Sequence, residues 1–325
     1  MFLIDFNGCK GNHKVYGGMA GSKLGIIYQE ENWILKFPKS TKGMKESEIS
    51  YTTSPLSEYV GSHVYQILGY DVHETKLGTK DHKLVVACKD FTNVNVQLQE
   101  FREIKNYYNK ELEAILEDTI TNSNSIGSTS LHAVKAHLEY NILMNMVEGI
   151  GNRFWDCAII DGFINNNDRN SGNWGVLSYS DGSFTLAPIF DNGASFSTKM
   201  SDDKIKELLQ NEERFISSAI NTVTGYNINE KILHFSKLLQ MDDEEIRSAI
   251  KRVVPQIQEH MKEISEMIYE IPESENGIEI ISEVRKNFYV KGMETRLQKL
   301  LLPALQQAQA FEERDDMMQE TEQKM

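Results

Sequence analysis

Residues 165–176 read NNNDRNSGNWGV, the most polar stretch in a region that is otherwise largely apolar. The apolar run FWDCAIIDGFI precedes it, and the pattern after it, GVLSYSDGSFTL, predicts a β-hairpin with an Asp-Gly turn at 181–182. A second polar triplet, Asp-Asn-Gly at 191–193, follows that hairpin. Because a hairpin brings its two ends together, we expect Asn173 and Asp191 to lie close to each other.

The oxygen-bearing side chains of these two segments suit a phosphoryl-transfer site. Asp168 precedes Asn173 by five residues, and Asp191 follows Asn173 by eighteen. Carboxylate and amide oxygens are magnesium ligands, so Asn173 and Asp191 fit a metal site, which leaves Asp168 to face a hydroxyl nucleophile. Asn, Asp and Gly are also ordinary turn residues, so a polar surface loop is the alternative. The joint fit of the spacing and the hairpin favours the site.

Each of three features nearer the N-terminus has two interpretations, one functional and one purely structural. The stretch YGGMAGSKLG (16–25) either brings backbone N–H groups close to phosphates or forms a tight turn. Lys36, in the apolar run WILKF, either binds phosphates or lies on the solvent side of a strand. Glu58 follows a helix start at Ser54 and Pro55 and either pairs with Lys36 or complements the helix dipole.

The order of all these features is that of a two-lobed kinase: glycine loop, strand Lys, helix Glu, Asp-x-x-x-x-Asn, hairpin and Asp. With MAGSK and ILKFPK upstream, the motifs NNNDRNSGNWG and APIFDNG resemble the HipA-like serine/threonine kinases, most closely the small proinflammatory bacterial ones. The resemblance spans about residues 15 to 300. It implies a two-lobed fold, ATP and Mg²⁺ as cofactors, phosphorylation of protein serine and threonine, and autophosphorylation.

The resemblance also implies a role for individual residues. Asp168 would be the catalytic base. Arg169 beside it would either offset developing charge or form a structural ion pair. Nucleotide binding would involve the loop over the phosphates, Gly21, Ser22, Lys23, Leu24 and Gly25, and Lys36 on the α- and β-phosphates with Glu58 as its partner. The hinge that starts at Ala87 would contribute Cys88, Lys89, Asp90 and Phe91. Asn170 would also bind the nucleotide, and Asn173 and Asp191 would be the metal ligands.

Several motifs of ordinary protein kinases, and one of HipA, are altered or absent in this sequence. Asn-Asp-Arg stands where ordinary eukaryotic protein kinases have His-Arg-Asp, Asp-Asn-Gly replaces Asp-Phe-Gly, and Ala-Pro-Glu is absent. Activation-loop control of the usual kind is therefore not expected. In HipA the autophosphorylated serine directly precedes Val-Ala-Gly, whereas Gly18 precedes Met-Ala-Gly in this chain. Ser22 is the nearest hydroxyl and is the candidate for autophosphorylation.

Charge and composition narrow the class of partner. The formal net charge is -14, which disfavours nucleic acid or an anionic membrane as the main partner, and with them the DNA-linked role of HipA. The N-terminus lacks the pattern of a Sec signal, and no run of ~18 apolar residues is present. We expect a soluble protein, cytoplasmic in the producing cell, and the resemblance suggests an effector delivered to host cells by a non-Sec route. The cysteines Cys9, Cys88 and Cys157 form no C-x-x-C pair, which predicts buried or idle thiols.

Hydrophobic periodicity predicts an α+β fold with a small β-rich N-lobe and a larger helical C-lobe. We expect the N-lobe over residues 1–92 and the C-lobe over 93–305. An acidic tail, 306–325, is expected to be an exposed helix end or disordered.

Within the N-lobe, LGIIY and NWILKF are expected to pair around the turn QEEN, followed by a helix from Pro55 and two further strands. Within the C-lobe, the periodicity predicts helices over 101–120, 131–146 and 151–164. The region from Lys204 to Leu302 is expected to be mostly helical.

Two other functions stay open. Phosphoinositide kinases share Asp-Arg-x-x-x-Asn, so the acceptor could be a lipid, although the acidic charge disfavours a membrane-facing basic surface. A catalytically weak pseudokinase that serves as a binding scaffold is the non-enzymatic alternative. It is disfavoured because every polar residue that the chemistry needs is present in the sequence.

Overall fold

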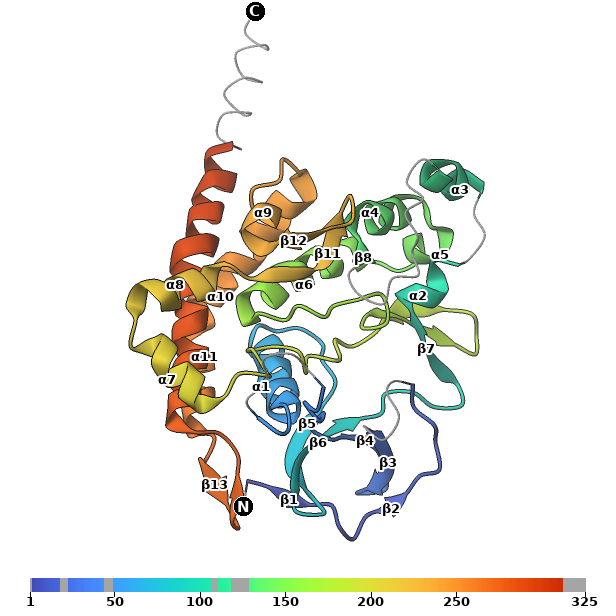
Figure 1. The fold of residues 1–325 in the computed structure, drawn as a ribbon. Helices are drawn as coiled ribbons and strands as arrows, with labels where there is room; N and C mark the ends of the chain where they lie inside the picture. Colours follow the sequence, from blue (N-terminus) through green and yellow to red (C-terminus); the bar gives the residue numbers. More distant parts are fainter. Residues whose placement is uncertain (1, 18–22, 44–48, 107–109, 118–128, 312–325) are drawn as a thin grey trace, which may run out of the picture.

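The computed structural model describes residues 2–17, 23–43, 49–106, 110–117 and 129–311. They form a curled, strand-rich part that contains the N-terminus and a larger part that is mostly helical (Figure 1). The α+β, two-lobed architecture expected from the sequence is confirmed.

The elements have the following bounds. The strands are β1 (Ile4–Asp5), β2 (Lys10–Gly11), β3 (Lys23–Tyr28), β4 (Glu31–Lys36), β5 (Thr75–Lys80), β6 (Lys83–Lys89), β7 (Val96–Glu100), β8 (Thr129–Ser130), β9 (Gly175–Tyr179), β10 (Phe184–Leu186), β11 (Val223–Ile228), β12 (Lys231–His234), β13 (Ser274–Glu275) and β14 (Ile278–Glu279). The helices are α1 (Ser54–Ile67), α2 (Phe101–Ile104), α3 (Lys110–Glu117), α4 (Leu131–Tyr140), α5 (Ile142–Asn145), α6 (Ile150–Ile164), α7 (Asp202–Leu209), α8 (Glu212–Ile220), α9 (Phe235–Leu238), α10 (Glu244–Glu270), α11 (Glu283–Arg296) and the π-helical turn η1 (Leu297–Leu301).

The N-terminal sheet has the strand order β1-β5-β6-β4-β3-β2. β3 and β4 pair as expected, through a turn in which Gln29 and Glu30 have positive φ (51° and 64°), as two-residue hairpins require. One face of the sheet closes over its own core, which consists of Phe6, Ile26, Trp33, Leu35, Val85 and Ala87. Directly paired residues point to the same face, so Lys36 and its partner Val86 lie together on the other face, which covers α1.

Helix α1 packs against β5 and β6 (Figure 1). It begins at Ser54, with Pro55 in its first turn as expected, but the N-cap is Thr53 and not Ser54. Val60 and Val64 are fully buried against the sheet. Glu58 lies on the same buried side of the helix, and this directs its carboxylate at the sheet instead of at solvent.

Helix α6 forms the centre of the larger part and packs against the long helix α10. Its residues are buried along almost the whole length, which accounts for the continuous apolar run and confirms the helix expected over 151–164. It ends at Asn165, which adopts the left-handed conformation (φ 56°) that stops a helix. The polar stretch 165–176 therefore begins where a buried helix terminates.

The hairpin β9–β10 follows that stretch, with Gly182 at its turn in the left-handed conformation, as expected. β7 pairs with β9 and turns the hairpin into a three-stranded sheet. β7 was not predicted, because its partner lies some eighty residues further along the chain and helical periodicity was expected from Asn93 onward.

Two helix expectations were wrong in detail. The helix over 101–120 is two helices, α2 and α3, in the described ranges. The helix over 131–146 breaks at Asn141, whose side chain accepts hydrogen bonds from the N–H groups of Leu143 and Met144 and so caps α5. The region from Lys204 to Leu302 is mostly helical, as expected, and also contains the antiparallel pair β11–β12. None of the helices in the described ranges has the length and apolarity needed to cross a membrane.

Candidate active site

Lys36 lies where three segments that are far apart in the sequence meet. Its Nζ is 2.9 Å from Oε2 of Glu58 on α1 and 2.9 Å from Oδ1 of Asp191, beyond the β9–β10 hairpin. These are three of the residues that the sequence predicted for the site. The sheet register and the buried face of α1 together produce the contact.

Charge pairing outweighs burial in this cluster. Burial disfavours the charged form of Lys36, but the carboxylates of Asp191 and Glu58 raise the pKa of Lys36 well above its usual value. Burial also favours neutral carboxyl groups, and the Lys36 ammonium overcomes it and lowers the pKa of both Glu58 and Asp191. All three groups are therefore ionised at neutral pH.

Asp191 is held in an uncommon backbone conformation. Its φ is 61°, in the left-handed region that residues other than glycine adopt rarely and often at functional sites. Its side chain is 35% exposed, in contrast to Glu58 at 1%. The Asp191 carboxylate is thus the one that solvent, a metal ion or a nucleotide can reach.

Asp168 is exposed, and its loop is held by amide side chains. Asn166 Oδ1 accepts a hydrogen bond from the Asp168 N–H (3.3 Å), and Asn173 Nδ2 donates to the Asp168 carbonyl oxygen. Asn170 Nδ2 donates to Oδ1 of the Asp168 carboxylate (2.9 Å). Within the described ranges no hydrogen bond uses Oδ2 of this exposed carboxylate, so that oxygen is free to accept one.

Arg169 points into the protein. Its Nε and Nη2 form a two-point contact with the carboxylate of Asp161 on α6, at 2.8 and 2.9 Å. Nη1 donates to the carbonyl oxygens of Asn173 and Phe190. Of the two roles that the sequence left open for Arg169, this geometry supports the structural ion pair, which ties the Asp168 loop to the segment that carries Asp191.

A buried polar chain continues from Arg169 to the N-terminal part. Arg169 Nη2 donates to Oδ1 of Asn192 (2.6 Å), and Asn192 Nδ2 donates to Oγ of Ser62 on α1 (3.0 Å). Ser62 Oγ is 3.3 Å from Nε2 of His73, which in turn lies 2.9 Å from Glu58 Oε1. Sequence reasoning missed Asp161, Asn192, Ser62 and His73. The position of Asn192 directly after Asp191 was the one available signal.

The predicted hinge continues from β6. The N–H groups of Lys89 and Asp90 donate to the carbonyl oxygens of Glu74 and Asn32, so sheet pairing uses them. In the described part of the chain no hydrogen bond uses the N–H of Phe91. That N–H is free to meet a nucleotide base. The side chain of Cys88 lies instead on the α1 side of the sheet.

The segment before the glycine-rich stretch is anchored on the hinge. The Asp90 carboxylate accepts hydrogen bonds from Lys14 Nζ and the Tyr16 hydroxyl, both at 2.8 Å. A Cβ at Gly25 would come within 2.0 Å of Asn12 Oδ1, so another residue at this position of β3 would displace the Asn12 side chain. Lys23 and Leu24 also belong to β3, whereas Gly21 and Ser22 lie outside the described residues.

The donor set fits a hard divalent cation. Asp191 offers Oδ2, since Lys36 contacts Oδ1, and Asn173 offers its amide oxygen, since Nδ2 donates to the Asp168 carbonyl. A carboxylate and an amide oxygen are ligands of the kind that Mg²⁺ takes in proteins.

No family model matches the chain. The serine/threonine-protein kinase CtkA of Helicobacter pylori strain J99 is 32% identical over 306 residues, which are 93% of this chain and 87% of that protein. The crystal structure of the Helicobacter pylori proinflammatory kinase CtkA superimposes with a TM-score of 0.80 at 29% identity, over 95% of this chain and 98% of the other. HipA of Shewanella oneidensis MR-1, in its complex with HipB and operator DNA, gives a TM-score of 0.45 at 11% identity, over 91% and 68% of the two chains.

Proposed function

The chain belongs to the family of CtkA, a serine/threonine protein kinase and hence a phosphotransferase, and we propose that it transfers the γ-phosphoryl group of ATP to protein hydroxyls with Mg²⁺ as cofactor. The observation that carries the proposal is the position of Lys36 Nζ, 2.9 Å from both Glu58 and Asp191. A lysine held by a helix glutamate beside the metal-binding aspartate is what kinase phosphoryl transfer requires.

Each charged residue has a distinct task in this mechanism. Lys36 binds the α- and β-phosphates, and Glu58 fixes the direction of its ammonium group. Asp191 and Asn173 would hold Mg²⁺, which supplies positive charge to the phosphates. Asp168 orients the acceptor hydroxyl and takes its proton through the free Oδ2. Because the transition state is loose, this positioning supplies most of the catalysis.

We propose separate contacts for the phosphates and for the adenine of ATP. Gly21 to Gly25 would cover the phosphates, and the hinge that includes Lys89, Asp90 and Phe91 would face adenine, with the unused N–H of Phe91 as one donor. Asn170 would lie near the phosphates beside Asp168. We place the N-lobe at 1–92 and the helical C-lobe at 93–305, so that ATP binds between them.

Substrates are proposed from the family and from the chemistry. We propose that the chain phosphorylates itself, with Ser22 as the candidate acceptor, and protein targets in a host cell. The relative of known structure is described as a proinflammatory kinase, which supports the host-effector role. A phosphoinositide acceptor is the second possibility, because the Asp-Arg-x-x-x-Asn loop is common to both kinase classes.

Radiolabelled ATP with Mg²⁺, followed by mass spectrometry, tests the function. We expect wild-type protein to gain phosphate on serine or threonine, and Asp168→Ala and Asp191→Ala to lose at least roughly 99% of that transfer while remaining folded. Asp203→Ala is the matched control, because the Asp203 side chain is 91% exposed on α7.

Three outcomes would contradict parts of the proposal. Undiminished autophosphorylation in both site variants would remove these residues from the chemistry. Phosphate transfer to phosphoinositide vesicles and not to protein would make the chain a lipid kinase. Nucleotide binding without transfer to any acceptor would make it a binding scaffold.

A further inference from the structure

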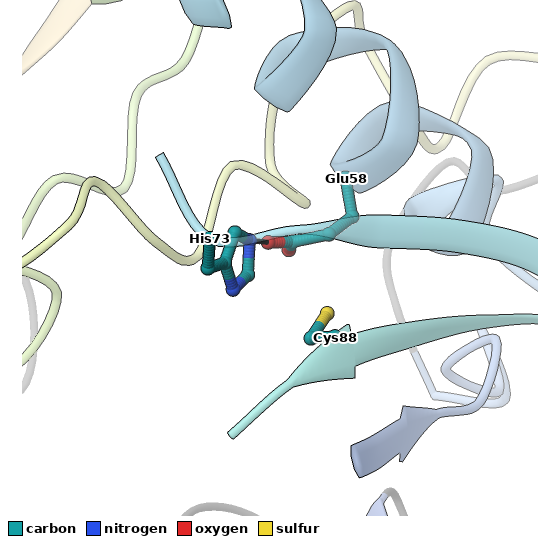
Figure 2. A group of neighbouring side chains, drawn as sticks. All are labelled: Glu58, His73 and Cys88. Atoms are coloured by element: carbon teal, nitrogen blue, oxygen red, sulfur yellow. Dashed lines mark ion pairs between the residues drawn. The ribbon is translucent and has the colours of Figure 1, made fainter. Parts of the chain in front are cut away.

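Glu58, His73 and Cys88 form a compact cluster behind Lys36. They come from α1, from the segment before β5 and from β6, and their side chains converge (Figure 2). The carboxylate, imidazole and thiol ligand atoms all lie within 4.8 Å of one another. All three residues are buried, with 1%, 6% and 1% exposure.

Glu58 Oε1 is a buried carboxylate oxygen of the cluster whose contact with His73 is an ion pair and not a well-oriented hydrogen bond. Glu58 Oε1 is 2.9 Å from His73 Nε2, but in the described part of the chain it has no well-oriented hydrogen bond. His73 Nε2 has Ser62 Oγ as a second neighbour at 3.3 Å. A buried carboxylate oxygen that lacks a well-oriented hydrogen bond is incompletely satisfied, and a metal ion bound to both Glu58 and His73 would satisfy it.

The donor set distinguishes this cluster from the magnesium site. One nitrogen, one oxygen and one sulfur donor suit Zn²⁺, whose bonds to such ligands are about 2.0 to 2.3 Å long. Mg²⁺ selects oxygen ligands and does not favour a thiolate. Tetrahedral coordination would require the three ligand atoms to move together by about 1 Å.

We propose that Glu58, His73 and Cys88 form an inhibitory Zn²⁺ site. Binding exchanges the Cys88 thiol proton, released to solvent, for a sulfur–zinc bond. The ion, the thiolate, the Glu58 carboxylate and a neutral imidazole then carry no net charge together, and Lys36 balances Asp191. No charge is left unpaired when the ion enters.

The inhibitory effect follows from the loss of Glu58 as partner of Lys36, and this part rests on the proposed kinase function. Glu58 Oε2 is 2.9 Å from Lys36 Nζ, so a divalent cation on the same carboxylate repels the ammonium group. Lys36 then keeps Asp191 as its carboxylate partner. Lys36 and Asp191 are thereby drawn away from the positions that ATP and Mg²⁺ need.

Cobalt(II) provides a test of binding that does not depend on activity. Titrated into the reduced protein, Co²⁺ should give a thiolate-to-cobalt charge-transfer band that saturates at one ion per chain. The band should be lost in Cys88→Ser and weakened in His73→Gln. It should be retained in Cys157→Ser, the matched control, because Cys157 is also buried but lies on α6. Absence of the band from wild-type protein, or its retention in folded Cys88→Ser, would overturn the site.

Activity measured with and without Zn²⁺ in the same variant tests the inhibition. At saturating Mg²⁺, wild type and Cys157→Ser should be inhibited, and Cys88→Ser should need at least roughly tenfold more Zn²⁺ for the same fractional loss. Equal sensitivity of Cys88→Ser and wild type would overturn the inhibitory role. A cobalt band in a chain that phosphorylates nothing supports the site and contradicts the kinase function, whereas an active kinase without the band contradicts the site alone.

Discussion

Two carboxylates from distant parts of the chain meet one ammonium group at Lys36, and they differ sharply in exposure. Glu58 is almost completely buried and Asp191 is partly open to solvent. Burial makes Glu58 dependent on Lys36 for its charge, whereas the Asp191 carboxylate stays partly open to solvent. The same three residues therefore serve both the stability of the fold and the proposed chemistry.

Acid should weaken the Lys36–Glu58 pair. The pKa of Glu58 is lowered in the folded protein, so its contribution to the free energy of unfolding is present above the unfolded carboxyl pKa of about 4 and is lost as pH falls through the lower folded pKa. Glu58→Gln should cost about 1 to 3 kcal/mol near pH 7, with a smaller difference from wild type below about pH 4. Urea unfolding at several pH values measures it, with Glu266→Gln as the exposed control. A difference independent of pH would contradict the ion-pair account.

Asp161 should matter to stability far more than its neighbour Asp156. Both lie on α6 and both contact an arginine, but Arg169 is 3% exposed and Arg252 is 36% exposed at the side chain. Asp161→Asn leaves the buried guanidinium without its carboxylate and should cost about 3 to 5 kcal/mol, whereas Asp156→Asn should cost about 1 kcal/mol or less. Urea denaturation of the two variants decides the point. Equal losses would mean that burial of the Arg169 pair is not what stabilises the loop.

At the scale of elements, α1 approaches the Asp191 segment through a glycine. A Cβ at Gly61 would lie 2.9 Å from the Asn192 Cβ, too close for any side chain unless α1 or the Asn192 segment moves. Because Glu58 and Ser62 lie on the same helix, a shift of α1 would also move the Lys36–Glu58 pair.

Gly61→Ala should therefore lower kinase activity, by at least roughly tenfold, although alanine is intrinsically the better helix former by about 1 kcal/mol. Gly151→Ala in α6 is the matched control, since its Cβ would meet open space and the change should leave activity intact. Steady-state phosphorylation rates of both variants, with circular dichroism for folding, give the comparison. Wild-type rates in Gly61→Ala would show that α1 can move without consequence.

Local patterns predicted the elements whose partners are near in sequence. The alternating runs that became β3 and β4 pair through a two-residue turn, and the apolar run before 165–176 became α6. β7 was missed because its hydrogen-bonding partner is β9, and the break at Asn141 was missed because a single side-chain cap decides it. Neither contact can be predicted from the secondary-structure propensity of the local sequence.

At the scale of the whole molecule, the sequence could predict those site residues that belong to the order and spacing of kinase motifs. Lys36, Glu58 and Asp191 were expected together and do meet. His73 and Asn192 were not predicted, because their importance arises from contacts between parts of the chain that only the tertiary fold brings together.

Those contacts connect the two lobes. A single hydrophobic core extends from α1 and β6 to α6 and α10, and the polar chain from Asp161 to Glu58 runs alongside it. The Asp168 loop and the Asp191 segment are thereby linked to α1 and to Lys36 on the N-terminal sheet.

Separate measurement of ATP binding and phosphate transfer in Asp168→Asn and Asp191→Asn tests the central claim most directly. Asp168→Asn should bind ATP with Mg²⁺ within roughly threefold of wild type and yet lose at least roughly 99% of its transfer rate, because Asp168 acts on the acceptor. Asp191→Asn should lose roughly tenfold or more in the Mg²⁺-dependent part of ATP binding as well. Equal magnesium dependence in the two variants, or full turnover in either one, would contradict the assignment of base and metal ligand.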